Sequence, residues 1–99
     1  MSSSWCEAIA AAAQAVGGGS RFKLRGEIKA EPWGHWLIAP TDAYLENDAS
    51  GPYSVLELEW IEVDPGKARP ELLMNLLTAA GISASVVRHW VRVQTPFPI

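Results

Sequence analysis

The chain has one cysteine, Cys6, and two histidines, His35 and His89, among its 99 residues. A single cysteine cannot form an intramolecular disulfide, so the fold must depend on an apolar core. None of the three residues lies at a spacing such as C-x₂-C or H-x₃-H that would bring metal ligands together. We therefore expect no metal site and no cofactor. Cys6 lies in the first turn of a predicted helix, and we expect it to fill the core and not to act as a nucleophile.

The chain also has fewer basic residues than acidic ones. Eight lysines and arginines stand against eleven aspartates and glutamates, which gives a formal net charge of −3 and a pI of about 5.2. Binding to nucleic-acid phosphates requires a surplus of basic residues, so we expect no nucleic-acid partner. No apolar run approaches the ~20 residues of a membrane-spanning helix, and the first residues lack the basic start of a signal peptide. These features predict a cytoplasmic protein without a membrane segment.

Tryptophan, by contrast, is abundant. The five indoles each lie inside or beside a segment with readable periodicity: Trp5, Trp33, Trp36, Trp60 and Trp90. One indole buries roughly 150–250 Å², and a short chain has few other ways to remove that much apolar area from water. We expect a single globular domain over residues 1–99, with Trp60 and Leu76 in its core.

Two segments have the spacing of amphipathic helices. Ser4 and Glu7 form a capping-box pattern at the start of the first helix, and the glycines at 17–19 end it. Pro70 and Gly81 bound the second helix. The residues expected to be buried recur every three or four positions. They are Trp5, Ala8, Ile9, Ala12, Ala13 and Val16 in the first helix, and Leu72, Leu73, Leu76, Leu77 and Ala80 in the second, with Met74 and Thr78 on the opposite side.

Other segments alternate apolar and polar residues, which is the period of half-buried strands. The segments expected to form strands are 20–31, 35–39, 53–63 and 83–95. Between Trp60 and Ile61 the apolar phase slips by one residue, which predicts a β-bulge that keeps both sets of apolar residues in the core. Arg88 and His89 mark either mid-strand positions or the turn of a tight hairpin.

This order of elements predicts an α+β fold. We expect a two-layer sandwich in which two helices cover one face of a mostly antiparallel sheet of four or five strands. The other face should remain in water because the first strand places Arg21, Lys23 and Arg25 there. We expect these cations to pair with Glu57 and Glu59 on a neighbouring strand.

Aromatic residues gather around a long predicted loop at 41–52, which is rich in Asp, Asn, Ser and Gly. Tryptophan and tyrosine are enriched among the residues that contribute most to protein interfaces. We therefore assign a candidate partner-binding site to Trp33, Trp36, Tyr44 and Tyr53. The alternative is that these rings form a second small core under the loop.

Several short motifs give the chain a family resemblance. They are the N-terminal Trp-bearing helix, Arg21-Phe22-Lys23-Leu24, residues 57–63, the leucine-rich helix ending at Gly81-Ile82, and residues 90–93. In these motifs the chain resembles a family of small bacterial proteins known only as a domain of unknown function. The resemblance implies a small α+β domain and supplies no catalytic residues.

In the absence of a catalytic constellation, the sequence favours a non-enzymatic protein-binding module: an inhibitor, an immunity-type protein or a phage counter-defence protein. Its acidic charge would speed encounter with a basic target such as a toxin or nuclease. Two alternatives stay open. One is an enzyme or small-ligand binder with a pocket under the 41–52 loop that uses His35 and Cys6. The other is a homo-oligomer that pairs through an exposed strand edge or the face around Trp90.

Overall fold

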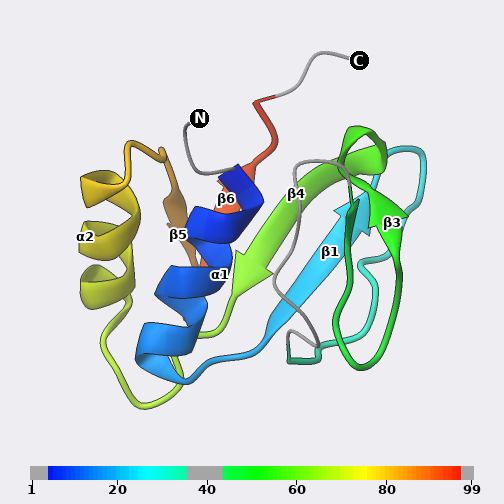
Figure 1. Ribbon diagram of the computed structural model, residues 1–99. Coiled ribbons are helices and arrows are strands. Elements are labelled where there is room, and N and C mark those ends of the chain that lie inside the picture. Colours follow the sequence, from blue (N-terminus) through cyan, green and yellow to red (C-terminus); the bar gives the residue numbers. More distant parts are fainter. Residues whose placement is uncertain (1–4, 36–43, 97–99) are drawn as a thin grey trace.

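The computed structural model describes residues 5–35 and 44–96 (Figure 1). The elements in chain order are α1 (Trp5–Val16), β1 (Ser20–Leu24), β2 (Tyr44–Leu45), β3 (Tyr53–Ser54), the 3₁₀ turn η1 (Val55–Glu57), β4 (Leu58–Val63), α2 (Pro70–Ala79), β5 (Ser85–Val87) and β6 (Trp90–Gln94). Four strands form an antiparallel sheet in the order β1-β4-β6-β5, and β2 pairs with β3 in a second, smaller sheet. The predicted α+β architecture is confirmed.

The core lies between the two helices and one face of the four-stranded sheet. Its buried apolar side chains come from α1, α2, the inner rows of β1, β4 and β6, and the β2–η1 region. They are Cys6, Ile9, Ala12, Ala13, Phe22, Leu45, Val55, Leu58, Ile61, Val63, Leu73, Leu77, Ile82, Val91 and Val93. Leu76 and Met74 pack at the edge of this cluster, whereas Leu72 is 50% exposed and Ala80 is also exposed. The buried stripe of α2 is therefore rotated towards Met74, which the sequence pattern placed on the opposite side.

Glycines with positive φ end both helices. Gly17 has a φ of 70° and Gly81 a φ of 79°, values that only glycine adopts without strain. Gly18 has a different role, because a Cβ at this position would collide with the backbone carbonyl of Asp64. The glycine run thus stops α1 and also lets the start of β1 lie directly against the end of β4.

β1 ends at Leu24 and not at Glu31 as the alternation predicts. Gly26 turns the chain with a φ of 84°, and the backbone N–H of Glu27 donates to the carbonyl of Leu24. The alternation continues in the sequence beyond this turn but no longer follows the sheet. Ile28, an apolar position of this alternation, is 94% exposed.

The segment after this turn returns along the outer edge of β1. The backbone N–H of Glu31 donates to Phe22, and Gly34 forms an antiparallel bridge with Ser20. The edge of β1 is therefore covered. Of the strand predicted at 35–39, the first residue is not in a strand and the others lie outside the described residues.

β4 contains a β-bulge, but it lies earlier than predicted. Lys23 of β1 pairs with Trp60, and the next residue, Leu24, pairs with Leu58, so Glu59 is the extra residue. The bulge keeps Leu58 in the core. Trp60 is 6% exposed, as expected for a buried residue, but it shares the outer face of the sheet with its partner Lys23.

Arg88 and His89 form the two-residue turn of the β5–β6 hairpin, because Val87 pairs with Trp90. Arg88 has a φ of 61°, which glycine or asparagine normally supplies in such turns. β5 lies at the far edge of the sheet, and Val86 is 46% exposed on it. Self-association through this edge stays a prediction.

Asn47 attaches the β2–β3 hairpin to β1. Its side chain is almost fully buried, at 2% exposure for the residue. The amide nitrogen donates to the carbonyl of Ser20 at 2.9 Å, and the amide oxygen accepts from the backbone N–H groups of Ala49 and Ser50 at 2.9 and 2.8 Å. Part of the predicted 41–52 loop is therefore a tight hairpin that contains β2, and the Asn47 side chain ties it to β1.

Replacing Asn47 by aspartate tests this role. Asn47→Asp keeps the oxygen that accepts from Ala49 and Ser50 but sets a carboxylate against the carbonyl of Ser20. We expect a loss of about 2–3 kcal/mol in the free energy of unfolding, because the buried carboxylate has no N–H to donate to the carbonyl of Ser20. Urea denaturation measures this loss. Asn75→Asp on the exposed side of α2 is the matched control and should change stability by less than about 0.5 kcal/mol. Equal effects of the two substitutions would contradict the assignment.

Candidate functional site

The three described residues of the predicted partner-binding site, Trp33, Tyr44 and Tyr53, do not form one cluster. Tyr53 packs edge-to-face on the core residue Phe22, with ring centroids 6.5 Å apart. Tyr44 is 59% exposed on β2, and Trp36 lies outside the described residues. Trp33 lies against Arg21 on the outer face of the sheet. Tyr53 is therefore a half-buried residue packed against the main core, and Tyr44 is an exposed ring on the hairpin.

The hydroxyl of Tyr53 donates to Oε1 of Glu31 at 2.7 Å and so fixes the returning segment against the hairpin. This hydrogen bond, followed by burial and the charge of Glu31, raises the pKa of Tyr53 above its ordinary value of 10.0. The folded protein therefore holds the phenolic proton more tightly than the unfolded chain does.

This shift predicts a stability difference that depends on pH. Because the pKa is raised on folding, the contribution of Tyr53 is complete below about pH 10 and is lost as the pH rises through the folded-state value. We expect the parent protein to exceed Tyr53→Phe in free energy of unfolding by a constant amount up to about pH 10, and by less above it. Urea titrations of both proteins between about pH 8 and 11 measure the difference. If the free energies of unfolding of the two proteins differ by the same amount at about pH 8 and about pH 11, the contact of Tyr53 with Glu31 is absent.

The outer face of the sheet has a buried charge at its centre. Glu62 is 0% exposed and lies between two arginines on the neighbouring strands, Arg21 of β1 and Arg92 of β6. One carboxylate oxygen accepts from Arg21 and the other from Arg92, each ion pair being 2.7 Å long. This Arg21–Glu62–Arg92 triad was not predicted, because alternation alone placed the face in water.

The outer ion pairs follow the predicted pattern in part. Lys23 pairs with Glu59 at 2.7 Å, as expected. The carboxylate of Glu57 accepts from the backbone N–H of Ser54 and completes a capping box on η1. The side chain of Arg25 donates to the backbone carbonyl of Leu56.

Tryptophan rings cover the triad. The guanidinium carbon of Arg21 lies 4.8 Å from the ring centroid of Trp33 and 4.7 Å from that of Trp90, and the two rings are 5.3 Å apart. Arg92 stacks on Trp60 at 4.2 Å. The guanidinium groups are thus held by a carboxylate in the sheet and by aromatic faces beside it, an arrangement that favours planar cations.

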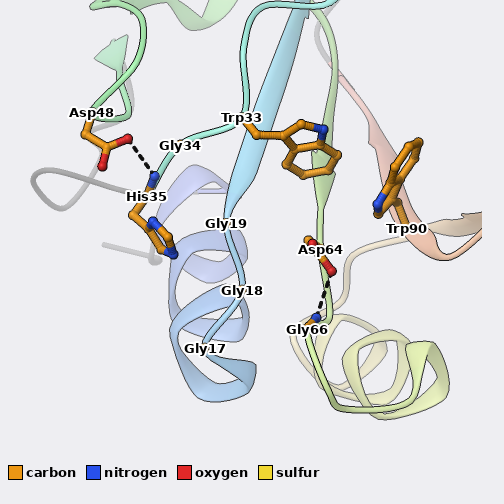
Figure 2. A pocket seen from close by; sticks show the side chains of 10 residues that line it. All are labelled: Gly17, Gly18, Gly19, Trp33, Gly34, His35, Asp48, Asp64, Gly66 and Trp90. Atoms are coloured by element: carbon orange, nitrogen blue, oxygen red, sulfur yellow. Dashed lines mark hydrogen bonds between the residues drawn. The ribbon is translucent and has the colours of Figure 1, made fainter.

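A groove of about 540 Å³ opens at the end of this layer, where α1 passes into β1 (Figure 2). Its size is within the range of about 300–1,000 Å³ that is usual for ligand sites. The side chains that line it are those of Trp33, His35, Asp48, Asp64 and Trp90. The remaining lining residues are all glycines, which offer only backbone.

The groove crosses four chain segments that lie side by side. The N–H of Asp64 donates to the carbonyl of Gly19, Ser20 is bridged to Gly34, and the N–H of Asp48 donates to His35. Asp64 and Asp48 therefore lie on opposite sides of the glycine segment, as Figure 2 shows.

Each carboxylate of the groove is oriented by a backbone N–H. Asp64 accepts from Gly66 at 2.8 Å, and Asp48 accepts from His35 at 3.0 Å. The ring of His89 lies 3.9 Å from the carboxylate of Asp64. These contacts fix one oxygen of each aspartate and present acidic groups at two places in the groove.

Cys6 and the histidines lie at opposite ends of α1. Cys6 is 1% exposed in the core, whereas His35 lies beside Gln14 and Gly17. Eleven residues of helix separate Cys6 from Gly17, about 16 Å at a rise of about 1.5 Å per residue. The arrangement therefore excludes a pairing of Cys6 with His35.

Within residues 5–35 and 44–96, no group of three or more His, Cys, Asp or Glu residues is placed to hold a metal ion. Neither described helix is long and apolar enough to cross a membrane.

No protein-family model, curated protein or solved structure matches the chain. The resemblance drawn from the packing motifs therefore stays a prediction.

Proposed function

We propose that the protein is a non-enzymatic binding module whose groove holds a positively charged segment of a partner protein. The observation that carries this proposal is the placement of two carboxylates, Asp48 and Asp64, in a groove walled by Trp33 and Trp90. Carboxylates accept hydrogen bonds from ammonium and guanidinium groups, and indole faces attract the same cations.

The net charge of −3 supports the same class of partner, because long-range attraction speeds the encounter with a basic surface. The proposal keeps the protein-binding function that the sequence favours, with inhibitors of basic toxins or nucleases as the matching type. It moves the site from the hairpin aromatics to the end of the sheet. Trp33 is common to both.

Binding of labelled hexa-arginine, measured by fluorescence anisotropy, tests the proposal. Asp64→Asn keeps the oxygen that accepts from Gly66 and removes only the charge. We expect it to weaken binding about tenfold, which corresponds to about 1.4 kcal/mol. Glu71→Gln removes the same charge from the exposed start of α2 and is the matched control, with a change of less than about twofold.

Three outcomes would contradict the proposal. Equal weakening by Asp64→Asn and Glu71→Gln would show that net charge, and not the groove, attracts the peptide. Equal binding of hexa-glutamate would exclude a cation site. Free arginine that binds as tightly as the peptide would instead favour the small-ligand alternative at His35 and the hairpin.

A further inference from the structure

The Trp33–Trp90 pair already contacts one guanidinium group, that of Arg21. The two rings are tilted by 51° and lie 4.8 and 4.7 Å from the guanidinium carbon. Glu62 neutralises this arginine at 2.7 Å. The protein's own chain thus shows that this ring pair contacts a planar cation on one side, and both rings also line the groove. Asp64 lies next to the pair in the groove and supplies the charge for a second cation (Figure 2).

The other end of the groove is a separate polar compartment formed by Asp48 and His35. A Cβ on Gly34 would collide with the carboxylate of Asp48, so this carboxylate lies directly against the backbone. Between the two compartments runs the segment 17–19, which has no side chains. A partner backbone can therefore approach the floor of the groove closely at its middle.

The distance between the two compartments follows from the chain segments that separate them. Adjacent segments of a sheet lie about 4.8 Å apart, and three such steps lead from Asp64 to Asp48. The two carboxylates are thus up to about 14 Å apart. An extended chain advances about 3.3 Å per residue and places every second side chain on the same face, so side chains four residues apart lie on one face about 13 Å from each other.

We infer that the groove binds an extended peptide segment with two arginines four residues apart. One guanidinium group stacks on Trp33 and Trp90 and pairs with Asp64, and the other pairs with Asp48. This inference rests on the proposed function and specifies the partner.

Two peptides of equal length and charge test the spacing. Both consist of glycine with two arginines, which are adjacent in one peptide and separated by three glycines in the other. We expect the spaced peptide to bind at least about tenfold more tightly, because adjacent side chains of an extended chain point to opposite faces and only the spaced peptide presents both arginines to the groove. Asp48→Asn, which keeps the acceptor for the N–H of His35, should remove this advantage and leave the affinity for the adjacent-arginine peptide unchanged.

The outcomes separate this inference from the proposed function. If both peptides bind equally and Asp64→Asn weakens both, the groove is a cation site but the two-arginine spacing is wrong. If the spaced peptide keeps its advantage in Asp48→Asn, the second compartment is misplaced and the inference is also wrong. If neither peptide binds, both the inference and the proposed function are overturned.

Discussion

Replacing Glu62 by alanine is expected to remove about 3–5 kcal/mol from the free energy of unfolding. The carboxylate is fully buried and neutralises two guanidinium groups, whose side chains are only 23% and 28% exposed. Without it, Arg21 and Arg92 keep their charges beside three indole rings and no longer have a common counter-charge. The loss comes mainly from these unpaired charges, since breaking a buried pair leaves the desolvation cost in place.

Glu59→Ala is the matched control for this prediction. Glu59 is on the same strand and pairs with Lys23 at the same 2.7 Å, but its side chain is 44% exposed. We expect its loss to cost less than about 1 kcal/mol, as is usual for surface ion pairs. Urea denaturation of both variants measures the comparison. Equal midpoints would show that Glu62 contributes no more than a surface glutamate.

Trp60→Ala is expected to cost about 3–5 kcal/mol, which is much of the 5–15 kcal/mol that stabilises a typical domain. The indole is 6% exposed, and Arg92 stacks on it at 4.2 Å. Truncation leaves a cavity under that guanidinium and removes the cation–π contact. Trp60→Phe retains an aromatic face and should lose about half as much or less. A Trp60→Ala protein that melts within a few degrees of the parent would show that the ring is a surface residue.

The helices and most strand positions could be predicted because their signals are local. Pro70 and Gly81 bound α2 through the geometry of one or two residues, and the alternation in β6 reports directly on its two faces. The end of β1 could not be predicted in this way. A single glycine, Gly26, turns the chain there, while the apolar pattern continues to Ile28.

The outer face was misjudged because alternation identifies a face but not what covers it. Charged residues on a strand usually indicate contact with water, yet Arg21 and Arg92 converge on one carboxylate and lie under indole rings. That outcome depends on β1 and β6 being the two neighbours of β4, and strand order is not visible in the periodicity.

The groove could not be found from the sequence because its residues come from five separate segments. The glycines at 17–19 predict only the end of a helix, and Asp64 simply follows the strand predicted at 53–63. Trp90 was assigned to a strand face, and nothing local links it to Trp33. Only the topology brings these residues to one end of the sheet.

A titration of the ¹⁵N-labelled protein with the spaced two-arginine peptide, followed by NMR, tests the central claim most directly. Binding in the groove predicts that the largest shift changes occur at the indole N–H groups of Trp33 and Trp90 and at the amides of Gly18, His35 and Gly66. Changes centred on the hairpin around Tyr44, or spread evenly over the acidic surface, would contradict the account.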